Sequence, residues 1–245
     1  MRHDRRERPR QCDFLGARAS SRGTLRAIKG PAGSRRFQGD LANSNREGAE
    51  FDFEAAQRFA ESLRKGGRVD RAVTISAEAL GRFPEDRPLL TTYGLSQLTL
   101  GRAHEALRPL ALVAQAEPQN WRVRSALGAA LDQLGRFPEA RAAYQEALTI
   151  EPSNARVMTN MGVSHIMAGE PEEAEPLLRQ AADLRDAPPE ARQNLAIALA
   201  LQGKFAEAEQ IERIDLPPQQ AAANISYLRG LLSDPRRWGD VGRSR

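Results

Sequence analysis

Small and large side chains alternate along residues 53–222 in a pattern that recurs at intervals of about 34 residues. When each unit is numbered from its first residue, position 7 is large and apolar or aromatic, and positions 8 and 20 are small. Position 15 is always glycine. The glycines are Gly67, Gly101, Gly135, Gly169 and Gly203, and the position-20 residues are Ala72, Ala106, Ala140, Ala174 and Ala208. The pattern predicts five consecutive units: 53–86, 87–120, 121–154, 155–188 and 189–222.

Each unit is expected to contain two helices that cross closely. Small residues at positions 8 and 20 let two helix backbones approach, and a larger side chain there would force them apart. Glycine at position 15 adopts the left-handed conformation that often follows a helix end. Proline at position 32 of the first three units (Pro84, Pro118 and Pro152) is expected to stop the second helix.

A helix–turn–helix unit of about 34 residues is typical of the tetratricopeptide repeat (TPR). We therefore predict an all-α fold, an α-solenoid of five TPR repeats within residues 51–222. Residues 219–232 are predicted to form one more helix, because Ile225, Leu228, Leu231 and Leu232 fall on one face. A solenoid needs a cap over its last repeat, so residues 223–245 are assigned to a C-terminal capping helix and a short tail.

Charge separates the first 50 residues from the rest. They hold 12 Lys/Arg and 6 Asp/Glu, whereas the remainder holds 24 and 26, so the net charge of +4 comes from the N-terminal segment. Its few large apolar residues follow no helical or strand period, and we predict a disordered basic tail over 1–50. Such a tail could bind nucleic acid, but its arginines are not interleaved with aromatic residues, so nucleic-acid binding is not expected.

The sequence contains features that bear on localisation. Cys12 is the single cysteine, which excludes an intrachain disulfide. No run of about 18 apolar residues is present, so membrane contact is expected only through partners. The basic N-terminus is not followed by an apolar segment, and Cys12 lacks the small, apolar residues that precede a lipid-modified cysteine. These features alone predict a cytoplasmic protein.

No catalytic, metal or cofactor site is predicted. His165 occupies position 11, where three other repeats have leucine, so we interpret it as a buried or half-buried structural histidine. The carboxylates Asp132, Glu139, Glu172 and Glu173 have the appearance of ordinary solvated helix residues. The sequence shows no strand pattern that could precede a phosphate-binding loop, and no His/Cys cluster with metal-ligand spacing. We therefore expect neither an enzyme nor a small-molecule substrate.

The predicted function lies on the concave surface that the first helix of each repeat lines. Positions 2, 5, 9, 12 and 13 are expected to face this groove, where apolar residues bordered by polar ones mark a protein-binding site. A helix or an extended apolar segment of a partner would fit there. These positions, together with position 6, give the candidate residues for contact with a partner: Thr91, Leu95, Leu98, Arg122, Ser125, Asp132, Arg156, Thr159, Asn160, Val163, Ile166, Gln193, Asn194, Ile197 and Leu201. Packing against a neighbouring repeat is the alternative for positions 12 and 13.

Asn160 and Asn194 recur at position 6 of consecutive repeats. An asparagine side chain both donates and accepts, so it can pair with the backbone of a bound peptide, or it can be an ordinary surface residue. The clamp that binds the C-terminal carboxylate of chaperones requires lysine at position 5 and asparagine at position 9. No repeat has either residue, which disfavours that class of partner.

Three stretches resemble TadD, the TPR protein of the tight adherence (Flp) pilus assembly system. They are Trp121–Leu148 with its LDQLGRFPEAR core, Arg192–Leu195 followed by LQGKFAEAE, and DLPPQQAAANISYLRGLL ending near Trp238. The last is the most discriminating, because TPR geometry does not require it. The resemblance covers about residues 53–238.

The resemblance implies a non-enzymatic accessory protein of Flp pilus assembly or secretion, located in the bacterial cell envelope. The N-terminus departs from that pattern, since it shows neither a signal peptide nor a lipobox. Two alternatives remain open: a cytoplasmic TPR chaperone or regulator of an exported client, and nucleic-acid binding through the Arg-rich tail. The sequence does not indicate an oligomeric state.

Overall fold

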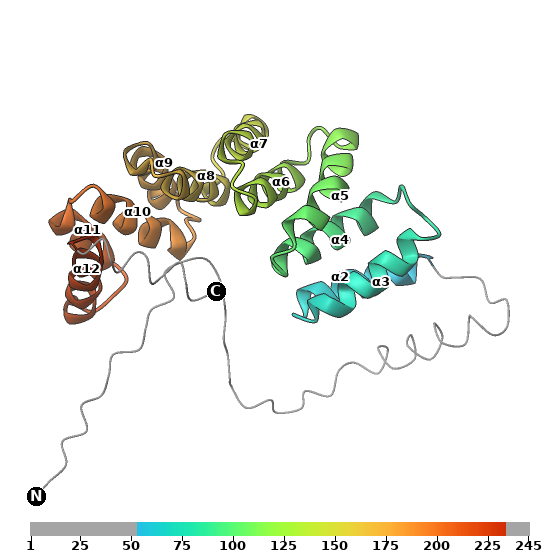
Figure 1. Ribbon diagram of the computed structural model, residues 1–245, viewed down its shortest axis with the longest axis horizontal. Coiled ribbons are helices and arrows are strands. Elements are labelled where there is room, and N and C mark those ends of the chain that lie inside the picture. The colour runs from blue at the N-terminus through green and yellow to red at the C-terminus, as the bar shows by residue number, and fades with distance from the viewer. Residues whose placement is uncertain (1–52, 234–245) are drawn as a thin grey trace, which may run out of the picture. The chain divides into compact units, whose positions relative to one another are not determined.

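The computed structural model describes residues 53–233, and every regular element among them is an α-helix (Figure 1). Five first helices alternate with five second helices, and a final helix, α12, follows them. The first helices are α2 (Phe53–Lys65), α4 (Arg87–Thr99), α6 (Trp121–Gln133), α8 (Ala155–Ala168) and α10 (Pro189–Leu201). The second helices are α3 (Val69–Leu80), α5 (Ala103–Ala116), α7 (Phe137–Ile150), α9 (Pro171–Asp183) and α11 (Phe205–Glu212), and α12 spans Pro218–Ser233.

Helix starts follow the period of the glycine series. First helices begin at residues 53, 87, 121, 155 and 189, and second helices at 69, 103, 137, 171 and 205. Three of the first helices have a side-chain cap from the last residue of the preceding repeat. Asp86 accepts from Leu89 N at 2.8 Å, Asn120 from Val123 N at 3.3 Å, and Asn154 from Val157 N at 3.1 Å. These bonds satisfy backbone donors that have no partner within the helix.

The turn inside each repeat is the one that the glycine series predicts. All five glycines have φ between 71° and 81°. At each turn the glycine N–H bonds to the third carbonyl before it, and the next N–H to the fifth before it, as in Gly135 N to Asp132 O and Arg136 N to Leu131 O. This is the Schellman arrangement. The positive φ explains why glycine recurs there, because L side chains rarely adopt this conformation. Crowding does not contribute, since no heavy atom lies within 4 Å of a built Cβ.

Close helix crossing explains the small residues at positions 8 and 20. The position-20 alanines are fully buried. A Cβ built on Gly94 would lie 2.7 Å from Leu110, one on Gly128 2.7 Å from Tyr144, and one on Gly162 2.6 Å from Leu178. The second helix therefore packs a large side chain directly over the glycine of the first helix.

Contacts between helices define an all-α solenoid, which confirms the predicted fold class. Each helix packs against the next one along the chain, from α2 to α12 (Figure 1). The first helices also contact one another in succession, whereas no comparable contacts join the second helices of the described part. A row of helix pairs bends toward the side where neighbours approach most closely, so the first helices form the concave side.

The last repeat is shorter and is followed by α12. α11 has only eight residues, and α12 packs on α11 and α10. Ile225 is 2% exposed within the core cluster of α9, α10 and α11, and Leu228 packs against that cluster. Asn224 also donates to the buried Glu212 at 2.9 Å. The predictions for residues 1–50, including Cys12, and for residues beyond Ser233 lie outside the described residues.

Candidate protein-binding surface

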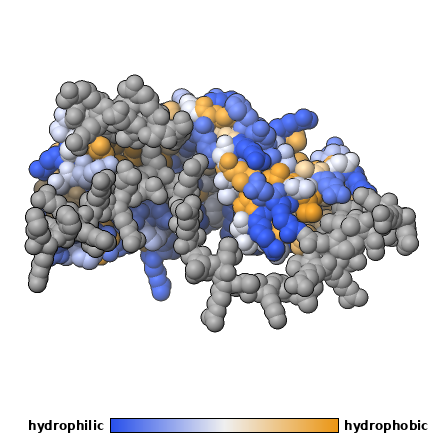
Figure 2. All heavy atoms as spheres, turned by 60° about the horizontal axis from the view of Figure 1, so that its bottom comes forward, coloured by the Kyte–Doolittle hydropathy of each residue, from blue (hydrophilic) through white to orange (hydrophobic). Residues whose placement is uncertain are grey.

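The candidate surface is built from one stripe of side chains on each first helix. Positions 2, 5/6, 9 and 12/13 are separated by three or four residues and therefore share one helix face. Because α4, α6, α8 and α10 lie next to one another, their stripes form one continuous surface. Apolar areas bordered by hydrophilic ones are visible on the face shown in Figure 2.

Solvent exposure divides the predicted residues into three groups. Arg122, Arg156 and Gln193 are exposed, and these three side chains are the most accessible to a partner. Half-buried residues form the largest group: Thr91, Leu95, Leu98, Asn160, Val163, Ile166, Asn194, Ile197 and Leu201. Ser125, Asp132 and Thr159 are buried.

The three buried residues correct the sequence interpretation, because they offer almost no area to a partner. Thr159 donates to Ala155 O of its own helix at 2.7 Å. Ser125 is 7% exposed and accepts from Asn160. Asp132 is 8% exposed, so its interpretation as an ordinary solvated carboxylate is wrong. These side chains belong to the packing beneath the surface.

Asp132 joins three helices through hydrogen bonds. Its carboxylate accepts from the Tyr144 hydroxyl on α7 at 2.8 Å and from Ser164 Oγ on α8 at 2.6 Å. Burial raises the pKa of Asp132. The hydrogen bonds from Ser164 and Tyr144 oppose that rise, and so do the nearby charges of Arg141 and His165. Burial, and then the charge of Asp132, raise the pKa of Tyr144. The repeat pattern did not predict this network, although a tyrosine at a position where both neighbouring repeats have leucine was a signal for it.

His165 lies beside this network and is half-buried, in agreement with its structural interpretation. Its Nδ1 lies 2.8 Å from Glu170 Oε2, which is also 3.0 Å from Arg141 Nη1. These contacts join α7, α8 and the residue before α9. Within residues 53–233, no group of three or more His, Cys, Asp or Glu side chains has the arrangement of a metal site.

The apolar candidates differ in how far they belong to the core. Leu95 and Leu98 pack against the cluster formed by α4, α5 and α6, and Ile166 packs against the cluster of α9, α10 and α11. Val163, Ile197 and Leu201 are half-buried and are not part of a core cluster. Met167 at position 13, which the sequence analysis missed, is 46% exposed.

Two pairs of apolar residues therefore remain available on neighbouring helices. Val163 and Met167 lie four residues apart on α8, and Ile197 and Leu201 occupy the same positions, 9 and 13, on α10. Residues at this spacing lie on one face, and α8 contacts α10. We call these four residues the apolar edge.

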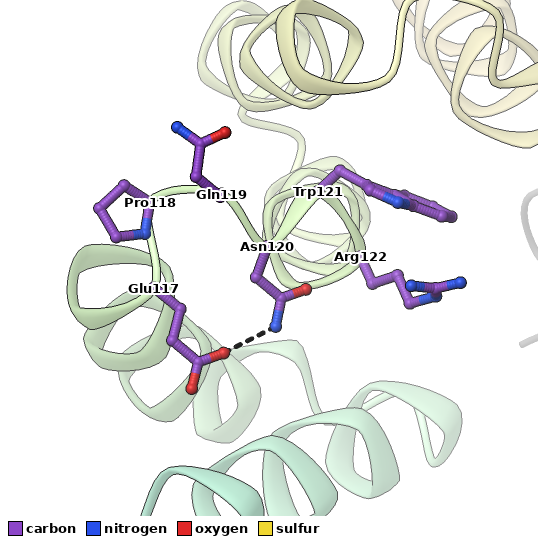
Figure 3. A pocket seen from close by; sticks show the side chains of 6 residues that line it. All are labelled: Glu117, Pro118, Gln119, Asn120, Trp121 and Arg122. Atoms are coloured by element: carbon purple, nitrogen blue, oxygen red, sulfur yellow. Dashed lines mark hydrogen bonds between the residues drawn. The ribbon is translucent and has the colours of Figure 1, made fainter.

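Two arginines lie at the opposite ends of these stripes. Arg122 on α6 and Arg156 on α8 both occupy position 2, in the first turn of their helices. The Arg122 guanidinium lies 4.5 Å from the centroid of the Trp121 ring. Figure 3 shows the Trp121 and Arg122 side chains extending to the same side of α6. We call Arg122 and Arg156 the basic edge.

The middle of the surface is polar. Asn160 donates to Ser125 at 3.4 Å across the α6–α8 contact. Asn194 has no side-chain hydrogen bond to another residue in the described part of the chain. Of the two asparagines that were considered for pairing with a peptide backbone, Asn194 is thus the one left with its full hydrogen-bonding capacity.

Charged contacts of the first and last repeats serve the packing of the solenoid. In repeat one, Gln57 donates to both carboxylate oxygens of Asp86 at 2.9 Å. Near the C-terminal end, Lys204 and Arg179, helped by Gln202, lower the pKa of Glu175 to about 2. The Gln57 contact holds the residue that caps α4, and the contacts of Lys204 and Gln202 with Glu175 join repeats four and five.

Comparison with known families decides the classification. The family described as tetratricopeptide repeat matches residues 91–155 and 159–230, and a second description of the same repeat matches residues 124–187. The chain belongs to the tetratricopeptide repeat family. Proteins of this family typically are non-enzymatic scaffolds that bind protein partners. No curated protein matched the sequence.

Solved TPR structures resemble this chain over most of its described length. The protein TTC0263 of Thermus thermophilus is 24% identical, with a TM-score of 0.59 over 72% of this chain and 98% of that chain. MamA of AMB-1 is 31% identical, with a TM-score of 0.52 over 62% of this chain and 90% of that chain. Another MamA structure has a TM-score of 0.57 at 18% identity, covering 70% of this chain and 94% of that one. The likeness to TTC0263 and to this second MamA structure shows the fold alone.

No helix among residues 53–233 is both long and apolar enough to cross a membrane.

Proposed function

We propose that this TPR protein is an accessory factor of Flp-type pilus assembly or secretion that holds a segment of a partner protein on the concave side of its first helices. The observation that carries the binding role is the apolar edge on α8 and α10. Val163, Met167, Ile197 and Leu201 leave apolar surface uncovered although the core clusters lie close by. Uncovered apolar surface with a polar border is typical of a protein-binding site.

The pilus assignment rests on the resemblance of the sequence to TadD. Its most discriminating stretch, DLPPQQAAANISYLRGLL, corresponds to the loop before α12 and to most of α12. The packing of α12 on α10 and α11 gives this stretch a structural role at the end of the solenoid. Envelope location follows from the same resemblance and is part of the proposal.

A cytoplasmic chaperone or regulator of an exported client is the second candidate. The same apolar edge favours it, because such a surface would also bind an apolar segment of an unfolded client. The two candidates differ in the partner that they bind: a component of the pilus machine in the first case, and an unassembled client in the second.

Site-specific photocross-linking in the native cell tests the proposal. A photoreactive amino acid replaces Ile197 on the apolar edge, and cross-linked proteins are identified by mass spectrometry. We expect a component of the pilus machine, such as the secretin, the pilus ATPase or a prepilin. Deleting the gene should abolish surface pili, and the wild-type gene should restore them.

The matched control places the same photoreactive residue at Leu112, a leucine of α5 that is 44% exposed on a second helix. Equal cross-linking from both positions would exclude the concave side as the binding surface. Cross-links from position 197 to clients unrelated to pili, together with normal pili in the deletion strain, would favour the chaperone alternative.

A further inference from the structure

Charge is distributed unequally between the two sets of helices. The five first helices carry eight Arg/Lys and four Asp/Glu, whereas the five second helices carry four Arg/Lys and twelve Asp/Glu. The first helices of the described solenoid therefore carry a net positive charge, and the second helices carry a net negative charge. A partner that binds the concave side experiences the basic field.

Among the arginines of the first helices, only the two of the basic edge lie outside an ion pair within residues 53–233. Neither Arg122 nor Arg156 forms an ion pair with another residue of the described part. In α4, α6 and α8 the single acidic residue is Asp132, and its carboxylate is buried and accepts hydrogen bonds from Tyr144 and Ser164. By contrast, Arg124 on α6 is paired with Glu146.

Two further features prepare the basic edge for a carboxylate. Stacking on Trp121 restrains the Arg122 guanidinium, so less side-chain entropy is lost when it binds an anion. Both arginines also lie in the first turn of a helix, where the helix dipole adds positive potential. At position 2 of α10 the residue is Glu190, so the basic edge ends at α8.

The distance between the two edges suits one helix. Arg156 and Met167 are eleven residues apart on α8, which corresponds to about 16 Å along the helix axis. A helix with its side chains is about 10–12 Å wide. A single helix lying across α6, α8 and α10 would therefore reach the basic edge on one side and the apolar edge on the other.

We propose that the concave side binds an amphipathic helical segment of a partner with an acidic side and an apolar side. Carboxylates of the segment pair with Arg122 and Arg156, over repeats three and four. Its apolar side chains contact Val163, Met167, Ile197 and Leu201, over repeats four and five. This inference rests on the proposed function and adds the chemistry and the orientation of the partner segment.

Peptide selection on the full chain tests the inference, with a random library of 16-residue displayed peptides as the probe. The library is selected on the wild-type protein, on the Arg122→Glu/Arg156→Glu variant and on a Met167→Glu/Ile197→Glu variant. Circular dichroism establishes that each variant is folded. Peptides from the wild type should be rich in Asp and Glu on one side of a helical projection and in Leu, Ile or Phe on the other.

Charge reversal should change the selected peptides in a defined way. The Arg122→Glu/Arg156→Glu variant should bind the acidic peptides about tenfold more weakly and should select Lys and Arg in their place. The matched control is Arg108→Glu, an exposed arginine on the second helix α5, which should leave affinity and selection unchanged.

The outcomes separate the inference from the proposed function. If apolar peptides bind and depend on Met167 and Ile197 but carry no excess of acidic residues, the inference is wrong and groove binding stands. If no selected peptide depends on Met167 and Ile197, both the inference and groove binding fail. If charge reversal at the basic edge and Arg108→Glu have equal effects, the role of Arg122 and Arg156 is excluded.

Discussion

At the scale of single residues, burial decides which polar side chains belong to the binding surface. Asp132 and Arg122 both fall at groove positions of the same helix. Tyr144 and Ser164 bind the Asp132 carboxylate inside the packing, whereas Arg122 lies exposed on the face of Trp121. The position in the repeat therefore predicts the direction of a side chain, and the partner across the helix interface decides its accessibility.

Replacing Asp132 with alanine should destabilise the protein. The substitution removes the acceptor of two buried hydroxyl groups, and an unsatisfied buried polar group costs about 1–3 kcal/mol. We expect the free energy of unfolding to fall by about 2 kcal/mol, measured by urea denaturation followed by circular dichroism.

The matched variant Asp132→Asn keeps an acceptor and removes the buried charge. Because the pKa of Asp132 is raised in the folded state, ionisation of this group destabilises the fold. The stability that the protonated Asp132 contributes is present at acidic pH and is lost as the pH rises through the titration of its carboxyl group. The asparagine variant should therefore gain stability relative to wild type between about pH 3 and about pH 7. A pH-independent difference would contradict this.

At the scale of elements, the sequence predicts where each helix pair begins, turns and ends. The glycine series predicts the turns, because the left-handed conformation is a local requirement that glycine satisfies. Asp132 could not be assigned in this way, since its hydrogen bonds to Tyr144 and Ser164 depend on the spatial register of three helices. For Leu98 and Ile166 at position 12, the sequence left open whether they face the groove or pack against a neighbouring repeat. Both pack against core clusters.

Two glycines of repeat four should respond differently to alanine. In Gly162→Ala, the new Cβ would lie 2.6 Å from Leu178 Cγ, in a fully buried contact between α8 and α9. Overpacking of this kind costs about 1–3 kcal/mol. Thermal or urea unfolding measures the loss, and a Leu178→Ala background should reduce the effect of the glycine substitution.

The control is Gly169→Ala, where φ is 81° and no heavy atom lies within 4 Å of the built Cβ. It should lose about 1 kcal/mol through backbone strain alone, and Leu178→Ala should not change that loss. If Leu178→Ala changed both glycine effects equally, steric overlap would not explain the glycine at position 8 of α8.

At the scale of the whole solenoid, stability depends on contacts between neighbouring repeats, so each end needs a cover. α12 provides it at the C-terminal end of the described residues. Ile225 and Leu228 extend the core cluster of α9, α10 and α11, and Asn224 donates to Glu212, whose pKa is raised by burial. α12 thus shields both the apolar side chains of this cluster and the Glu212 carboxylate from solvent.

Removal of residues 218–245 should loosen the last repeat before the others. The deletion exposes the cluster around Leu195 and Leu199 and leaves the eight-residue α11 packed on one side only. Hydrogen exchange should show the largest loss of protection in α10 and α11, with α4–α7 changed little, because repeats contact mainly their neighbours. The matched control ends the chain after Ser233, keeps α12, and should retain protection in α10 and α11. Equal loss of protection in both truncations would assign the stabilisation to residues beyond α12, and equal protection would show that the last repeat is stable without its cover.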